Sequence, residues 1–297
     1  MRALLNLGPY SAAIERHKLK VDGLVVLQQG RRIGSYRWTP DTPRNIYSVS
    51  KSFTAIAAGM AIDEGKLRLS DRVLDAFEDP APEPSPRLSA LRVEHLLTMS
   101  RGYPHFTRPR HVAEVLAQPL SYDPGTVFVY DNASTFLVSA MLTRATGRTL
   151  RDFLVERLFR PLDIPDPVWR ESEDRFSLGA TGLELSTESL GVFGQFLLQR
   201  GKWQGTQLVP AQWIDGATRT QIPTRNPRFK DTLKPDYDLG YGYQFWMCRH
   251  GAYRCDGKDG QFVVVLPRQE AVVAISSHEE NMKPILYLVW DHILPQL

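Results

Sequence analysis

The chain has 297 residues, of which 42% are hydrophobic and 23% are charged, and its formal net charge is +3. This composition is ordinary for a globular protein, and the charge is too mild to indicate nucleic-acid binding. No apolar run reaches the roughly 18 residues that a membrane helix needs, and residues 1–14 make a poor signal peptide. We therefore expect a cytoplasmic protein with no nucleic-acid or membrane partner, built as one large domain or as two layers around one core.

The N-terminal part predicts a short helix followed by a strand hairpin. The helix is expected over 11–20, and the β-branched, apolar run 21–28 predicts a strand. Residues 29–31 would turn the chain, and residues 32–38 would return as the second strand. The sheet of this protein therefore begins near its N-terminus.

Ser48 and Lys51 stand at the mouth of a predicted central helix. The following run of small and apolar residues, 53–62, is apolar nearly all round and predicts a buried helix that Gly65 would end. Residues three apart share a helix face, so a hydroxyl and an amine would meet as a nucleophile and its proton acceptor. The alternative is a capping serine before a solvated lysine, because Ser-x-x-Lys is a loose pattern with about one chance match in a chain this long.

The middle of the chain predicts helices, and the last part predicts strands again. Helices are expected over 93–100, 112–118, 134–146, 150–159, 190–199 and 211–218. Strands are expected over 241–247, 262–266 and 271–276, with a closing amphipathic helix over 284–294. These elements predict an α+β protein, in which residues 1–47 and 236–297 form an antiparallel sheet flanked by N- and C-terminal helices. Residues 48–235 would form an inserted, all-helical region, with Ser48 at the seam, where ligand pockets are common.

Three motifs then occur in a fixed order. Ser48 with Lys51 comes first, Tyr130 with Asn132 second, and a glycine-rich turn between late strands third. This order resembles the serine β-lactamases and penicillin-binding proteins over nearly the whole chain, most of all the class C β-lactamase-like serine hydrolases. Three ordered motifs are far more specific than one. The resemblance implies a β-lactamase-like fold and an acyl-enzyme on the serine, with a small ester, amide or β-lactam as substrate.

The resemblance also assigns roles in catalysis. Ser48 would be the nucleophile, and its proton would pass either to a neutral Lys51 or to a Tyr130 phenolate whose pKa the lysine cation lowers. The two groups would titrate together. Asn132 would hydrogen-bond the acyl side of the substrate and help to hold Lys51, whereas alone it would be interpreted as a helix cap, and Tyr130 as a core residue. Asp131 replaces the small residue common at that position, and we expect it to point away from the pocket.

The third motif has two possible registers. Residues 258–260 match Lys-Thr-Gly by letters, but residues 255–257 lie at the better distance from the following Gly-Gln and strand, and we favour them. Asp256 and Gly257 would then line the substrate strand, where a glycine permits close approach. The backbone N–H of Lys258 would join that of Ser48 as an oxyanion hole. The missing lysine weakens the case for binding a β-lactam carboxylate and points to esters or small amides.

We predict a serine hydrolase without a metal or cofactor. The alternatives are a β-lactamase or D-Ala-D-Ala-type peptidase and, in another class, a ligand-binding or β-lactam sensor protein without turnover. The absence of Gly-x-Ser-x-Gly argues against an α/β-hydrolase. Tyr241, Tyr243, Phe245 and Trp246 are candidates for lining the acyl pocket, although aromatic strand residues are usually core.

The chain has two cysteines, Cys248 and Cys255. Two cysteines are too few for a disulfide framework, and their spacing matches no zinc pattern. They flank a stretch that could be a tight hairpin, so a local disulfide is one alternative. Two free thiols are the state more typical of a cytosolic protein.

Overall fold

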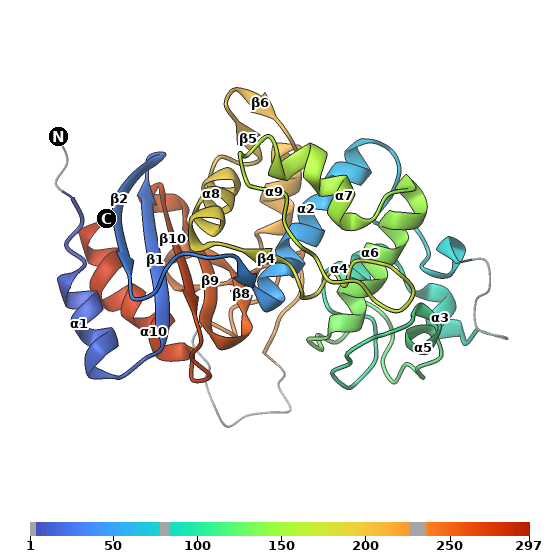
Figure 1. The fold of residues 1–297 in the computed structure, drawn as a ribbon. Coiled ribbons are helices and arrows are strands. Elements are labelled where there is room, and N and C mark those ends of the chain that lie inside the picture. Colours follow the sequence, from blue (N-terminus) through green and yellow to red (C-terminus); the bar gives the residue numbers. More distant parts are fainter. Residues whose placement is uncertain (1–3, 78–83, 226–235) are drawn as a thin grey trace.

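A six-stranded antiparallel sheet forms the centre of the computed structural model, which describes residues 4–77, 84–225 and 236–297 (Figure 1). The strand order is β2-β1-β10-β9-β8-β7. The strands are β1 (Val21–Gln28), β2 (Arg31–Arg37), β7 (Trp246–Met247), β8 (Tyr253–Gly257), β9 (Gln261–Leu266) and β10 (Ala271–Ser277). Strands from both ends of the chain therefore share one antiparallel sheet, and the predicted α+β fold is confirmed.

Helices cover both faces of the sheet (Figure 1). They are α1 (Gly8–Arg16) and α10 (Lys283–Leu288), with a π-helical turn over Val289–Ile293, on one face, and α8 (Thr187–Leu198) on the other. Strand β1 is buried on both sides, since Leu24 and Val26 join the core under α1 and α10 while Val25 faces α8. A Cβ atom at Gly194 would lie 2.4 Å from Val272, so glycine is what allows α8 to approach the sheet so closely.

A second group of helices lies beside the sheet (Figure 1). It contains α2 (Ser50–Asp63), α3 (Pro86–Ala90), α4 (Val93–Leu97), α5 (Val112–Leu116), α6 (Asn132–Thr146), α7 (Leu150–Leu154) and α9 (Ala211–Ala217). Two short ribbons pair β3 (Arg44–Asn45) with β4 (Glu184–Leu185) and β5 (Lys202–Trp203) with β6 (Thr206–Gln207). None of the helices in the described ranges is long and apolar enough to cross a lipid bilayer.

Helix α2 is the central, buried helix that its apolar sequence predicts. All of its side chains from 50 to 61 are buried. The Phe53 ring stacks on Phe193 of α8 with 3.7 Å between the ring centroids. The helix therefore packs both against the layer on the sheet and against the helical group, and it ends near Gly65, which adopts the expected left-handed φ of 68°.

Several predicted boundaries are wrong, and the longest error is the strand over 241–247. Tyr241 forms only isolated β-bridges and β7 covers the last two residues, because Gln244 adopts a φ of 67°, which interrupts a strand. Helix α1 begins at Gly8, ahead of the predicted start, and α6 begins at Asn132. The two cysteines are free and buried, as expected of thiols that do not form a bridge.

Candidate active site

Ser48 lies in a 3₁₀ turn, Tyr47–Val49, that leads directly into α2, whose first residue is Ser50. The Asn45 side-chain oxygen accepts hydrogen bonds from the backbone N–H of Tyr47 (2.9 Å) and of Gly182 (3.1 Å). Tyr47 adopts a left-handed φ of 47°, which is uncommon for a residue with a side chain and is enriched at functional sites. Asn45 therefore ties the serine turn to the loop that contains Gly182.

Lys51 projects from the first turn of α2 towards the serine. Its Nζ atom lies 2.9 Å from Ser48 Oγ, 2.6 Å from Asn132 Oδ1 and 3.0 Å from the carbonyl oxygen of Ala180. The lysine side chain is fully buried. Three neutral oxygens therefore surround a buried amine. The structure brings together the lysine, the serine and the asparagine of the first two motifs.

Burial changes the acid–base properties of this group. Removal from water lowers the pKa of Lys51 to about 7, although the carboxylates of Asp131 and Asp256 act to raise it. The Tyr130 phenol lies beside Ser48, and its ring centroid is 4.9 Å from Lys51 Nζ. Removal from water raises the pKa of Tyr130 above its ordinary value, and the neighbouring Ser48 hydroxyl only partly opposes this. Of the two alternatives for the base, these surroundings favour neutral Lys51.

Asp131 precedes α6 and points away from the serine. Its side chain is 1% exposed and accepts a hydrogen bond from Arg101 Nε at 2.7 Å. Its other oxygen accepts from the backbone N–H of Thr107 at 2.9 Å and from the Thr107 hydroxyl at 2.8 Å. The carboxylate between Tyr130 and Asn132 thus holds a neighbouring loop, a function that the sequence pattern does not indicate.

The third motif lies at the end of β8. Residues 255–257 are the last of this strand, and Lys258–Gly260 form the turn that follows. A Cβ atom at Gly257 would lie 2.5 Å from the carbonyl oxygen of Ile46. Only glycine permits this approach, which brings the strand end against the serine turn. The next residue, Lys258, lines the cavity beside Ser48.

Asp256 and the aromatic candidates lie elsewhere. The Asp256 carboxylate accepts hydrogen bonds from Arg254 Nε (2.8 Å) and from the Tyr237 hydroxyl (3.2 Å), and it does not line the cavity. Residues 241–246 do not line it either, so the expectation that they form the acyl pocket is wrong. Trp246 instead packs on Tyr130, with ring centroids 5.6 Å apart. Tyr241 also packs on the Tyr130 ring, so these two aromatic residues support the tyrosine.

A cavity of about 380 Å³ opens beside Ser48. Its lining residues are Tyr47, Ser48, Phe106, Arg108, Pro109, Asn132, Leu178, Ala180, Thr181 and Lys258. Sequence reasoning identified three of these, Ser48, Asn132 and Lys258. The loops 106–109 and 178–181 were missed as site residues because no motif marks them, and the only signal was the glycines around the second loop, at 179 and 182.

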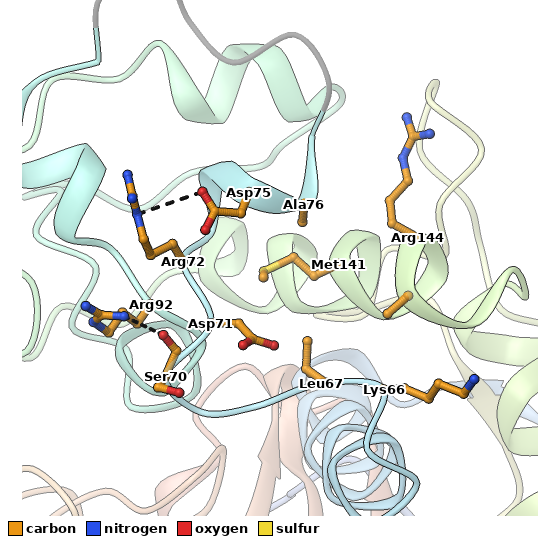
Figure 2. A pocket seen from close by; sticks show the side chains of 11 residues that line it. Lys66, Leu67, Ser70, Asp71, Arg72, Asp75, Ala76, Arg92, Met141 and Arg144 are labelled. Atoms are coloured by element: carbon orange, nitrogen blue, oxygen red, sulfur yellow. Dashed lines mark hydrogen bonds and ion pairs between the residues drawn. The ribbon is translucent and has the colours of Figure 1, made fainter.

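A second cavity, of about 460 Å³, lies at the other end of α2 (Figure 2). Its wall carries four basic side chains, Lys66, Arg72, Arg92 and Arg144, and two acidic ones, Asp71 and Asp75. Arg72 pairs with Asp75 at 3.8 Å, and Arg92 donates to the carbonyl oxygen of Ser70. The length of α2, about 21 Å at 1.5 Å per residue, separates this cavity from Ser48. None of the residues of the three motifs lines it.

Known proteins share both the fold and parts of the sequence. The family model described as Beta-lactamase matches residues 11–286. Lovastatin esterase from Penicillium rubens is 29% identical over 189 residues, which are 52% of this chain and 46% of the esterase. D-aminopeptidase from Brucella anthropi is 34% identical over 154 residues, which are 47% of this chain and 29% of the aminopeptidase. The chain thus spans less than half the length of these two relatives.

A solved structure shows the same fold over the whole chain. A penicillin-binding protein homologue from Caulobacter crescentus has a TM-score of 0.77 and covers 100% of this chain and 99% of its own, at 16% sequence identity. The matched family region contains all three motifs, with Ser48, Tyr130 and Gly257 gathered around one turn. The chain belongs to the Beta-lactamase family.

Proposed function

We propose that this protein is a serine hydrolase that cleaves a small ester or amide through an acyl-enzyme on Ser48. The observation that carries the proposal is the distance of 2.9 Å between Ser48 Oγ and the fully buried Nζ atom of Lys51. A buried amine has a lowered pKa and can accept a proton near neutral pH. Membership of the family, and relatives named as an esterase and an aminopeptidase, support acyl-bond hydrolysis.

The proposed reaction uses groups that this geometry brings together. Neutral Lys51 takes the hydroxyl proton of Ser48 as Oγ attacks the carbonyl carbon, and the backbone N–H groups of Ser48 and Lys258 stabilise the oxyanion. The proton returns through the Tyr130 hydroxyl to the leaving alcohol or amine, and the acyl-enzyme remains. Water then attacks the acyl carbonyl and gives its proton to Lys51, which releases the acid and restores the serine hydroxyl.

The residues at the end of β8, beside the serine, favour esters and small amides over β-lactams as substrates. At the position of the missing motif lysine stands Cys255, a buried residue whose thiol pKa is raised by burial, so that it carries no charge toward the cavity. The cavity of about 380 Å³ suits a small acyl group. Location in the cytoplasm belongs to the same proposal, and the two free cysteines are in the state expected of a reducing compartment.

Steady release of p-nitrophenol from p-nitrophenyl acetate tests the proposal. We expect turnover, an acyl adduct on Ser48 by mass spectrometry, and a loss of at least about 10³-fold in kcat for Ser48→Ala. Ser50→Ala is the matched control, because this buried hydroxyl has no hydrogen-bond partner among the residues that the structure describes, and its loss should leave the rate unchanged.

Two results would contradict the proposal. A single stoichiometric burst without turnover would favour a sensor protein, and an unchanged rate in Ser48→Ala would remove the serine from the mechanism. D-amino-acid amides and a chromogenic cephalosporin, assayed alongside, separate the esterase from the peptidase and β-lactamase alternatives.

A further inference from the structure

The cavity beside Ser48 has an unbalanced charge. Two cationic side chains, Arg108 and Lys258, line it, and none of the lining residues in the described part of the chain is acidic. Lys258 Nζ already lies 3.6 Å from the carboxylate of Asp259. Arg108, by contrast, makes no hydrogen bond or ion pair with any residue that the structure describes. An arginine that has no anionic partner within the described ranges therefore faces the proposed acyl cavity.

Hydrogen bonds to the buried Asp131 hold the backbone next to Arg108 in place. The preceding residue, Thr107, donates both its backbone N–H and its hydroxyl to Asp131, at 2.9 and 2.8 Å. Asp131 is 1% exposed and is itself paired with Arg101, which is 3% exposed and also donates to the Thr107 hydroxyl at 3.2 Å. A buried ion pair thus fixes the loop to the turn that carries Tyr130. The position of Arg108 relative to the catalytic groups is therefore set before a ligand binds.

The chemistry of the cavity wall indicates what this arginine binds. Guanidinium groups match the planar, two-oxygen geometry of a carboxylate. Apolar surface accompanies Arg108 in the same cavity, since Phe106 is 52% exposed and Leu178 and Pro109 also line the wall. An exposed aromatic ring beside an unpaired cation fits an apolar chain that ends in an anion.

We propose that the acyl group that enters this cavity carries a terminal carboxylate and that Arg108 binds it. This inference rests on the proposed acyl transfer at Ser48 and narrows its substrates to monoesters or monoamides of dicarboxylic acids. Arg108 shares the cavity with Asn132, to which we assign the acyl side of the scissile bond, so we place the recognition on that side. The buried Asp131 acts as a positioning residue for Arg108.

Matched ester pairs test the inference. The substrates are the mono-4-nitrophenyl esters of adipate, pimelate and suberate, each compared with its neutral methyl-capped counterpart after subtraction of spontaneous hydrolysis. We expect the best anionic ester to have a kcat/KM about tenfold above its neutral partner, the scale of one charge-assisted hydrogen bond. Added salt should narrow the preference, because the arginine is exposed and screening weakens its attraction.

Variants of the loop assign the effect to one residue. Arg108→Gln should lower kcat/KM for the anionic ester about tenfold and leave the neutral ester within about twofold. Arg110→Gln is the matched control, since Arg110 is 73% exposed, lies 3.8 Å from Glu173 and does not line the cavity. The Arg110→Gln variant should keep the full preference for the anionic ester over the neutral one. Thr107→Val, which removes one of the two hydrogen bonds to Asp131, should lower kcat/KM for the anionic ester and leave that for the neutral ester unchanged.

The outcomes separate this inference from the proposed function. The carboxylate assignment would be overturned if the wild type hydrolysed neutral and anionic esters at equal rates. It would also be overturned if Arg108→Gln lowered kcat/KM equally for both esters. Either result would leave the serine hydrolase intact. A protein that turns over none of the esters would overturn the hydrolase and, with it, this inference. A preference that Arg110→Gln also abolishes would assign the effect to the general charge of the loop and overturn the specific role of Arg108.

Discussion

Burial of the Lys51 amine predicts a dependence of stability on pH that can be measured without a substrate. In the folded protein, the pKa of Lys51 is lowered from 10.5 to about 7. The unfolded chain keeps the lysine proton up to about pH 10.5, whereas the native state releases it above about pH 7. Between these values the unfolded state binds more protons, so the free energy of unfolding rises with pH. Lys51→Met removes this contribution.

The size of the effect follows from the same shift. A difference of about 3.5 in pKa means that keeping the buried amine protonated destabilises the native state by about 5 kcal/mol, at about 1.4 kcal/mol for each unit of pKa. At pH 7, about 4 kcal/mol of this cost remains. Methionine avoids the cost but loses the hydrogen bonds to Ser48, Asn132 and Ala180, at about 1 kcal/mol each. We therefore expect Lys51→Met to be about 1 kcal/mol more stable than the wild type at pH 7 and about 3 kcal/mol less stable at pH 10.5.

Urea unfolding of both proteins across this pH range measures the difference. Tyrosines and other groups that titrate here are common to both proteins, so their contributions cancel in the comparison. Ser48→Ala is the control, because it keeps the lysine and should follow the wild-type pH dependence. A stability difference between Lys51→Met and the wild type that stays constant with pH would refute the lowered pKa, and with it the neutral lysine as the base.

Four further predictions concern activity and packing. The kcat/KM of the wild type should rise with pH through about 7, because Lys51 must lose its proton. Tyr130→Phe should lower kcat by at least about a hundredfold. An unaltered kcat in this variant would remove the tyrosine from the mechanism. Gly257→Ala should reduce kcat and cost about 1–3 kcal/mol in urea unfolding, since its Cβ would meet a backbone oxygen just before the serine turn at 2.5 Å. Gly216→Ala, where nothing lies within 4 Å, is the control and should not destabilise. Phe53→Ala should lower the free energy of unfolding by about 4 kcal/mol, and a loss under about 1 kcal/mol would contradict its place in the core.

The sequence was sufficient wherever one local property decides the structure. The run 53–62 has so little polar surface that only a buried helix suits it, and α2 is such a helix. The β-branched runs that form β1, β9 and β10 could bury both faces and still pair their backbone N–H and C=O groups only inside a sheet. The order of the three motifs sufficed to identify the family, because each motif needs a particular residue type at a particular spacing.

Other features depend on residues that are distant in the sequence. The amine of Lys51 has a lowered pKa because packing removes it from water, and the groups that enclose it include Asn132 and Ala180, 81 and 129 residues further on. The loop of Arg108 lines the cavity because Asp131 holds Thr107, and no local pattern marks that contact. Composition and periodicity thus determine which segments are buried. Which polar groups face one another inside, and hence the acid–base chemistry, is decided only when the packed layers bring those segments together.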